Sequence, residues 1–466
     1  MVKEYNKIKK YLNYRNRTKQ FVAILVIGVF LAASTLVYIG AKGSKDVVGT
    51  LSDSSVILSN DSSEVTIDPY DESSTELPAY TYKVTPTYVL DASGKKVYSG
   101  TATACIQWAN DKTPTGGTVS LAAGTFSLTG KIWINKNLVG AGTSTKLVAA
   151  KNLGTDTMVQ VAKRDFSALS KITLSNFEVD GKGATYTSGI YGGIELVRCT
   201  YCTLSNIYIH HFPKSHGIEF QASSYNTVTN CRIANIGYGN QYGNGICSGS
   251  QVAGVSSTYN KIDGCTITGC SMVGVNWEPG NNNVVSNTVI KALTSWSGRT
   301  TGITVWNKGG YANSNNNQFI NVQVDDDDTN LVSTGTTGTV IKGCTFTGAK
   351  SSGVYTSGCS SWTISDNKII TKGGHGIYTW NSNKMKVTGN YVEDGSGAKK
   401  GRGIWITSDS THTSSGNTIS SNKVVNCAYG IMFGAKTISS TVTNNVVTGC
   451  YTEYKITSGN TVSNNS

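Results

Sequence analysis

Residues Trp362–Asn383, WTISDNKIITKGGHGIYTWNSN, carry the pattern that decides the fold. They read as a strand with alternating apolar residues, a glycine-rich turn, a strand that begins Gly-Ile, and a polar turn. The same pattern recurs along the chain. With the first apolar residue of each copy as its mark, copies fall at Leu174, Leu204, Val228, Ile262, Val285, Phe319, Ile341, Ile364, Val387, Ile419 and Val442. Marks 22 to 34 residues apart predict a solenoid whose longer copies contain inserted loops.

The first 85 residues have a different composition. Residues 1–20 are basic, and residues 21–41 form an uncharged stretch of 21 residues, long enough to span a bilayer. The basic side is expected in the cytoplasm. The alternative is a secretory signal cleaved near Ala41. Residues 42–85 are rich in Ser, Thr and acids and predict an unstructured stalk. We therefore expect residues 86–466 outside the cell, either anchored at its surface or secreted.

The exported part is strongly basic. Residues 86–466 contain 30 Lys and Arg against 19 Asp and Glu, a net charge of +11. This excess favours a polyanionic partner, although it also fits a merely lysine-rich, soluble surface. Since no nucleic-acid-binding motif is found, the expected partner outside the cell is an acidic polysaccharide.

The 11 cysteines follow the repeat. Cys231, Cys265 and Cys344 each lie three residues after a mark, and Cys427 and Cys450 share another position on adjacent coils. Equivalent positions stack at about 4.8 Å in a solenoid, within reach of a disulfide bond. Packing as small apolar residues is the favoured interpretation. The CTYC pair at 199–202 lacks the second pair that a zinc site needs.

Asparagine also follows the repeat. The position two residues after the mark is usually small or polar, and one step later Asn367, Asn390, Asn422 and Asn445 occupy four consecutive coils. Stacked amides at a bend hydrogen-bond to one another along the axis, so we expect these residues to be structural.

The entry to the solenoid has a recognisable order. Residues 104–110 (ACIQWAN) predict a helix that caps the open end, and GGTVSLAAGTFSL (116–128) and IWINKNLVGAGTSTKL (132–147) predict strands with glycine turns. This stretch resembles the opening of the pectate-lyase superfamily. The resemblance, together with 22–23-residue coils of three short strands, implies an all-β, single-stranded right-handed parallel β-helix over residues 86–466.

The Gly-Ile strand presents one outward face. Because side chains alternate along a strand, the residue after each Ile points outward. These residues are Glu195, Glu219, Cys247, Asn276, Thr304, Tyr355, Tyr378 and Trp405. Two residues further along come Gln221, Glu278, Trp306, Ser357, Trp380 and Thr407, and just before each Gly-Ile come His216, Asn244, Thr301, Ser352, His375 and Arg402. Acids and amides gather towards the N-terminal half, and aromatic residues towards the C-terminal half.

We interpret this face as a sugar-binding groove, because exposed aromatic rings are costly unless something covers them. The substrate-binding candidates are Asn276, Glu278, Trp306, Tyr355, Tyr378, Trp380, Trp405, Arg402 and His375. The alternative is that a loop of the long copy 387–419 covers the rings. Glu195 and Glu219 lie one coil apart, so they either act as an acid–base or cation-sharing pair or are ordinary surface acids.

A second resemblance concerns three consecutive copies. Residues 176–182 (NFEVDGK), 211–221 (HFPKSHGIEFQ) and 233–246 (IANIGYGNQYGNGI) are similar to successive coils of alginate C5-epimerases and related uronate lyases. The family pattern is VDGN, then Y-G-F-D-P-H, then DG. The family's catalytic Tyr falls on His216, its Asp on Glu219, its His on Gln221 and its later Asp on Asn244, so each is substituted. The resemblance thus implies where a site lies. His216 retains acid–base capacity, whereas Gln221 cannot transfer a proton.

The chain contains two further motifs. The sequence Gly374-His375-Gly376 resembles a polygalacturonase motif, but the other motifs of that family, N-T-D and a nearby D-D pair, are not at the required spacing. The acidic run Asp325, Asp326, Asp327 and Asp328 offers the oxygen ligands that Ca²⁺ prefers, although a solvated acidic turn is the favoured interpretation. Calcium is the one cofactor that this sequence suggests.

Three functions remain open at this stage. The first is a surface-anchored enzyme that acts on an acidic polysaccharide by β-elimination or C5-epimerisation. Its centre would comprise Glu219, Glu195, His216, Asn244 and Gln221, with Arg402 or Arg299 as partners of the uronate carboxylate. The second is a non-catalytic glycan-binding adhesin or envelope protein. The third is a glycoside hydrolase with Glu195 and Glu219 as its carboxylate pair. Fold alone does not choose among them.

Overall fold

A computed structural model describes residues 80–189, 191–237, 242–249, 255–293, 300–307, 313–325 and 328–466. The expected basic segment at 1–20, the membrane span or signal at 21–41 and the stalk up to residue 79 lie outside these ranges. Within them, no helix has the length and apolar character needed to cross a bilayer. Apart from one α-helix and a short 3₁₀ turn, the regular secondary structure of the described residues is all strand, as predicted.

The quoted stretch forms one complete coil. It contains β31 (Thr363–Ser365), β32 (Lys368–Thr371) and β33 (His375–Trp380). Ile364 pairs in parallel register with Ile341 of the preceding coil and with Val387 of the next. Every mark from Leu174 to Val442 pairs with its neighbour in the same way. The solenoid of parallel coils is therefore confirmed.

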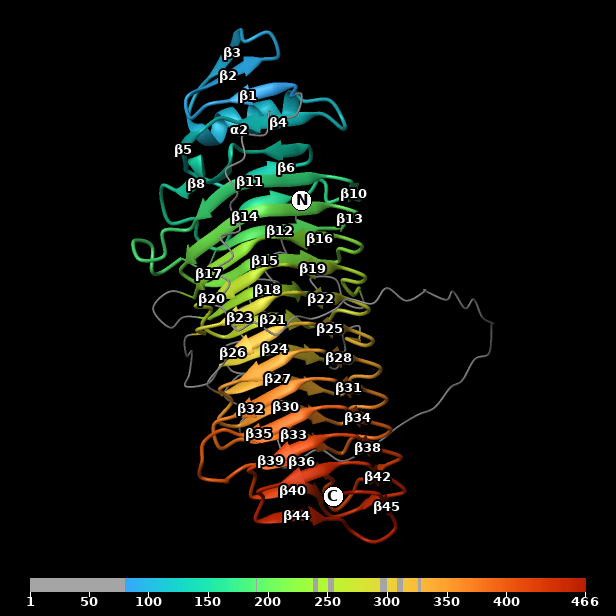
Figure 1. Cartoon of the computed structure of the whole chain (residues 1–466). Coiled ribbons are helices and arrows are strands. Elements are labelled where there is room, and N and C mark those ends of the chain that lie inside the picture. Colours follow the sequence, from blue (N-terminus) through green and yellow to red (C-terminus); the bar gives the residue numbers. More distant parts are fainter. Residues whose placement is uncertain are drawn as a thin grey trace, which may run out of the picture. The chain divides into compact units, whose positions relative to one another are not determined.

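The third strand of each coil joins a 13-stranded parallel sheet, whose strands stack coil upon coil (Figure 1). Its strands are β6 (Ile132–Ile134), β9 (Thr157–Val161), β12 (Gly192–Val197), β15 (Ser215–Gln221), β18 (Gly243–Gly249), β21 (Val273–Trp277), β24 (Thr301–Trp306), β27 (Thr329–Thr334), β30 (Ser352–Ser357), β33, β36 (Arg402–Thr407), β40 (Tyr429–Phe433) and β44 (Thr452–Lys455). The first two strands of each coil belong to a second, 28-stranded network. Inward residues such as Ile218 and Ile377 are fully buried between the sheets and form the core.

The N-terminal end is capped as expected. The helix α2 (Ala102–Lys112) begins at Thr101, whose side chain accepts a hydrogen bond from the Ala104 N–H, and it buries Cys105, Ile106 and Ala109. The solenoid begins earlier than predicted, because β1 (Tyr82–Val84) pairs in parallel with β4 (Thr118–Leu121). Residues 82–84 were assigned to the stalk. They fold because they bury apolar surface such as Val84 on this sheet.

The small or polar residues two positions after each mark have a backbone cause. In all eleven copies this residue adopts a left-handed φ between 48° and 68°. Only Gly, Asn and Asp adopt this conformation at low cost, which explains their recurrence there. One step later, Asn367, Asn390, Asn422 and Asn445 form the expected ladder, in which each side-chain N–H donates to the next amide oxygen at 2.9 Å.

All eleven cysteines are free thiols. Cys231, Cys265 and Cys344 are buried, and the backbone N–H of Cys427 donates to the Cys450 sulfur at 3.3 Å. The packing interpretation of these cysteines is confirmed.

Candidate functional site

The 13-stranded sheet aligns the outward residues as the repeat predicted. Glu195 pairs with Glu219, Glu219 with Cys247, and Cys247 with Asn276. Further along, Tyr355 pairs with Tyr378, and Tyr378 with Trp405. His216 and Asn244 are likewise direct partners on β15 and β18. Acidic and amide side chains thus occupy one half of a single face and aromatic side chains the other.

The centre of the polar half is the pair His216 and Glu219. Both side chains are about one-sixth exposed, and His216 Nε2 lies 3.8 Å from Glu219 Oε2. Gln221, two residues further on the same strand, donates its side-chain N–H to the other oxygen, Glu219 Oε1. The glutamate is therefore held between an imidazole and an amide, and it still faces the surface.

Tyr242 and Asn244 of the next coil complete this centre. The Tyr242 ring meets the His216 ring edge-on, with centroids 5.6 Å apart. Asn244 is fully buried and donates its side-chain N–H to the Tyr242 hydroxyl at 3.1 Å. Burial, assisted by the neighbouring Cys247 and Glu219, raises the pKa of Tyr242. Its phenol is therefore protonated at physiological pH.

Glu195 lies on the adjacent strand β12 but has different hydrogen-bond partners. It is only 9% exposed, and its Oε2 accepts hydrogen bonds from the Gln160 side-chain N–H at 2.8 Å and from the Thr157 hydroxyl at 3.4 Å. Gln160 in turn accepts from the Lys131 ammonium at 3.2 Å. These contacts orient Glu195, so it resembles a positioned carboxylate more than an ordinary surface acid.

Two other features mark the polar half. Asn276, 8% exposed, has a buried side-chain oxygen without a hydrogen-bond partner among the described residues. Ligand atoms of His216, Glu219 and Cys247 lie within 4.8 Å of one another, as in a metal site. However, burial and the Glu219 charge raise the pKa of the Cys247 thiol well above its ordinary value, which makes it a poor ligand.

The aromatic half is a stack. Tyr378 and Trp405 lie parallel with centroids 4.1 Å apart, and Tyr355 lies 5.1 Å from Tyr378. The Arg402 guanidinium covers the Trp405 ring at 4.0 Å. The prediction that Tyr378 and Trp405 offer open stacking platforms is therefore wrong, because their faces are covered by each other and by neighbouring side chains. The stacked rings form a continuous aromatic surface on this half of the face, and their edges are the parts that remain partly exposed.

His375 is built into this aromatic surface. Its Nδ1 accepts the Arg402 backbone N–H at 3.2 Å, and its ring meets both Tyr378 and Trp405 edge-on. Burial, together with the Arg402 charge, lowers the pKa of His375 to about 4. The residue is thus neutral at physiological pH.

Trp306 and Trp380 each lie two residues after an outward residue of the 13-stranded sheet, Thr304 and Tyr378 respectively. They are half-buried, and their strands β24 and β33 are three strands apart. Glu278, also half-buried, directly follows β21. These three residues stay candidates for substrate binding.

The two halves are too distant to share one reaction centre. Arg402 on β36 lies seven strands from His216 on β15, which corresponds to about 34 Å. At this distance Arg402 cannot contact a uronate carboxylate bound at the His216 centre, so Arg402 is excluded as its partner there. Arg299 lies outside the described residues.

The acidic run is only partly described. Asp325, at the end of β26 (Gln323–Asp325), is exposed and accepts the Thr347 hydroxyl at 3.1 Å, while residues 326–327 lie outside the described ranges. Calcium binding at this turn stays a prediction.

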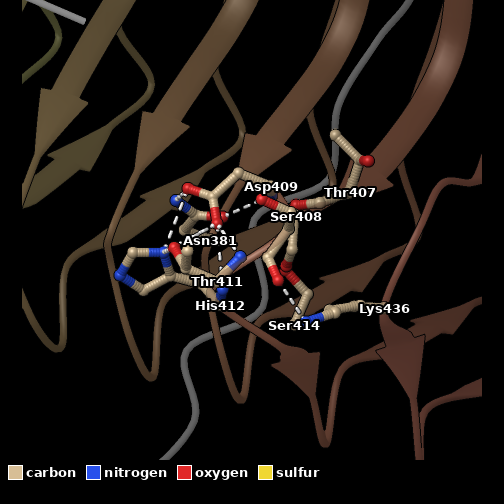
Figure 2. A network of polar contacts seen from close by, with 9 residues as sticks. Asn381, Thr407, Ser408, Asp409, Thr411, His412, Ser414 and Lys436 are labelled. Carbon is tan, nitrogen blue, oxygen red and sulfur yellow. Dashed lines mark hydrogen bonds and ion pairs between the residues drawn. The ribbon is translucent and has the colours of Figure 1, made fainter. Parts of the chain in front are cut away.

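In the long copy 387–419, the residues that follow β36 form a network of polar contacts with Asn381 of the preceding coil (Figure 2). After β36, Asp409 accepts the His412 imidazole N–H at 2.8 Å and the Asn381 side-chain N–H at 2.7 Å. These bonds lower the pKa of the Asp409 carboxyl. The inserted residues are thus fastened to the turn just after Trp380.

The chain matches a family model described as "right handed beta helix region" over residues 170–329 and 301–466. The protein belongs to this family. No similar sequence is found among curated proteins.

Several solved β-helix structures resemble this one. The A-module of mannuronan C-5 epimerase AlgE6 from Azotobacter vinelandii has a TM-score of 0.56 and 15% identity, and covers 78% of this chain and 94% of its own. The surface adhesin PfbA of Streptococcus pneumoniae has a TM-score of 0.51 and 13% identity, over 75% and 87% of the two chains. A tailspike protein of E. coli bacteriophage HK620, in complex with a pentasaccharide, has a TM-score of 0.51 and 14% identity, over 82% and 78%. At such identities the likeness shows the β-helix fold alone.

Sequence reasoning missed three residues of the polar half: Tyr242, Gln160 and Lys131. Gln160 pairs with Glu195 one coil before the first counted copy, so extending the repeat upstream would have found it. Tyr242 precedes β18 next to residues 238–241, where the inserted loop interrupts the pattern. Its proximity to His216 follows only from the stacking of coils.

Proposed function

We propose that this protein binds an acidic polysaccharide along the 13-stranded face and modifies it at the His216 centre, by β-elimination or C5-epimerisation of a uronate. The observation that carries this proposal is the convergence of His216, Glu219 and Tyr242 from two adjacent coils. The net charge of +11 over residues 86–466 supports a polyanionic substrate.

Both reactions begin with removal of the proton next to the uronate carboxylate. His216 is the base that takes this proton, and the protonated Tyr242 is the acid. In β-elimination the acid protonates the departing O4 oxygen, and in epimerisation it returns a proton to C5 from the opposite face. The charge of the carboxylate must be stabilised as the carbanion forms, and the side-chain N–H group of Asn276, two strands from Glu219 on the same face, is suited to this role.

The structural neighbours add support of a general kind. A mannuronan epimerase, a phage tailspike with bound pentasaccharide and a surface adhesin share this β-helix fold. We also propose that the protein acts outside the cell, anchored through residues 21–41 or released after their cleavage.

The test is incubation of the purified protein with alginate, pectate and other polyuronates, with and without Ca²⁺. A lyase produces the ultraviolet absorbance of an unsaturated uronate, and an epimerase changes the polymer's NMR spectrum without that absorbance. New reducing ends without unsaturation identify the hydrolase alternative, with Glu195 and Glu219 as its carboxylates. No change in any polymer contradicts the enzymatic proposal for those substrates.

A variant locates the centre. Glu219→Gln should lower the activity about 100-fold with an unchanged circular dichroism spectrum, since it removes the carboxylate beside the base His216, and general acid–base catalysis contributes about 10² to 10⁴ in rate. Glu453→Gln, at an exposed residue on β44, is the matched control and should retain full activity. Full activity in Glu219→Gln would show that the reaction occurs elsewhere.

Non-catalytic glycan binding is the second candidate. One observation favours it: Gln221, at the family's histidine position, donates a hydrogen bond to Glu219 and cannot itself transfer a proton. This function would be established if the protein bound to an immobilised polyuronate but changed none of the polymers chemically.

A further inference from the structure

A second cluster of polar side chains lies outside the 13-stranded sheet. It is built from β11 (Thr173–Asp180) and β14 (Thr203–Phe212), parallel neighbours in which Asp180 pairs with His210. The Nδ1 atoms of His210 and His211 are 2.6 Å apart, and both lie within 3.9 Å of Asp180 Oδ1. Two imidazoles and one carboxylate therefore point at the same small region.

The backbone makes this convergence possible. Consecutive residues of a strand normally point to opposite faces. His211 adopts a left-handed φ of 54°, which interrupts the alternation and leaves both imidazoles on the same side. Gly181, directly after Asp180, allows close approach, because a Cβ there would lie 2.9 Å from the His211 carbonyl oxygen. The VDGK motif thus has a structural role in holding Asp180 beside the two histidines.

The surroundings orient the ligand atoms. His210 is 6% exposed, and its Nε2–H donates to Glu178 Oε1 at 3.1 Å. This assignment leaves a lone pair on His210 Nδ1, which accepts a hydrogen bond from the Nδ1–H of His211. Such carboxylate–histidine contacts are the usual second layer of metal sites. The ring is also stacked on Tyr208 at a centroid distance of 4.1 Å. His210 is therefore held ready as a nitrogen ligand.

Two ammonium groups contact the carboxylates of this cluster, each at the oxygen that the histidines do not face. The Lys146 ammonium binds Glu178 Oε2 at 2.9 Å, and the Lys182 ammonium lies 3.4 Å from Asp180 Oδ2. The histidines face the other oxygen of each carboxylate. A cation can approach on the histidine side, where the His211 side chain is 40% exposed.

We propose that Asp180, His210 and His211 bind a divalent transition-metal ion of the Zn²⁺ class. Two imidazole nitrogens and one carboxylate oxygen suit such ions better than Ca²⁺ or Mg²⁺, and three protein ligands leave a position open to solvent. Ligand nitrogens around tetrahedral zinc lie about 3.3 Å apart, so the rings must separate slightly. The half-exposed His211, in contact with Asn235 at 3.2 Å, is the ring that can move. The ion would brace the corner from which the chain enters β15.

The test uses the purified full-length protein, freed of metal with a chelator and titrated with ZnCl₂ by calorimetry and with CoCl₂ by visible absorption. One ion per chain is expected, with cobalt d–d bands but no thiolate charge-transfer band. His211→Gln and Asp180→Asn should each weaken binding at least tenfold. His412→Gln, at an exposed histidine elsewhere, is the matched control and should bind like the wild type.

Other outcomes overturn the proposal. Absence of binding by the wild type, or unchanged binding in both variants, would exclude this site. A thiolate charge-transfer band that vanishes in Cys247→Ser would place the ion at His216, Glu219 and Cys247 instead. The circular dichroism of each apo variant separates ligand loss from misfolding. Because the readout is metal affinity, the result is independent of whether any polyuronate is modified.

Discussion

His375 shows how packing sets the charge of a single residue. It lies among Tyr378, Trp405 and Arg402, so a proton on its ring would be both poorly solvated and next to a fixed positive charge. The imidazole therefore acts as a neutral aromatic side chain in the aromatic surface of the 13-stranded sheet, although its GGHG setting invites a catalytic interpretation.

This environment predicts a pH-dependent stability. The pKa of His375 is lowered to about 4 in the folded protein, whereas an unfolded histidine has a pKa of about 6.5. Between these values the unfolded chain binds the additional proton, so the free energy of unfolding falls as pH decreases from 6.5 to 4 and levels off below. Thermal unfolding at a series of pH values should show a smaller decrease in His375→Gln. An identical decrease in the variant would contradict the assignment to His375.

The left-handed turn residues predict a graded substitution series. At Gly343, with φ 63° and no atom within 4 Å of an added Cβ, alanine should cost about 1 kcal/mol and asparagine less. At Gly389, φ is 68° and the added Cβ would lie 2.5 Å from Asp366 Oδ1, so alanine should cost more. The midpoints of chemical denaturation give the comparison. Equal effects of Gly343→Ala and Gly389→Ala would mean that the Asp366 contact is unimportant.

At the scale of elements, each coil is held to the next by strand pairing and by asparagine side chains inside the turns. Asn390 donates to Asn422 and to the Ile364 carbonyl, and it accepts from the backbone and side chain of Asn367. Each internal amide therefore forms hydrogen bonds to buried groups of both the preceding and the following coil.

Removal of an internal rung should therefore be costly. Asn390→Ala leaves several buried donors and acceptors unpaired, and we expect a loss of about 3 kcal/mol. Asn465→Ala is the control, because Asn465 is the last rung and is partly exposed. Denaturation of both variants gives the difference. Comparable losses would show that the internal amides contribute no more than the last one.

At the scale of the whole β-helix, contacts are made between neighbouring coils and local stability should vary along the axis. The N-terminal coils are covered by α2, whereas Val462 in the last described coil is 50% exposed. Its register partner in the preceding coil, Val442, and the equivalent residue of a central coil, Ile364, are fully buried.

Hydrogen exchange should reveal this gradient. Amides of β45 (Thr461–Ser463) should exchange faster than those of β31 and β32, because less buried apolar surface resists their opening. Mass spectrometry of peptides from both regions measures the rates. Uniform protection would instead indicate a single cooperative unit.

Sequence alone determined the coil, its register and the composition of its outward face. The fold follows from local rules that repeat: an apolar mark, a turn residue that tolerates a left-handed φ, and alternation along short strands. Register then placed Glu195 beside Glu219 and His216 beside Asn244 without any knowledge of tertiary structure. The boundary at residue 86 was wrong, because β1 precedes the first recognisable copy.

Only the tertiary structure decided how these side chains are engaged. Tyr242 reaches His216 from the next coil, Gln160 and Lys131 hold Glu195 from the preceding ones, and Trp405 is covered on both faces. The cluster of Asp180, His210 and His211 depends on a break in strand alternation that no periodicity predicts. The physical reason is that strand register fixes which residues are neighbours, whereas side-chain contacts, burial and charge fix what those neighbours can do.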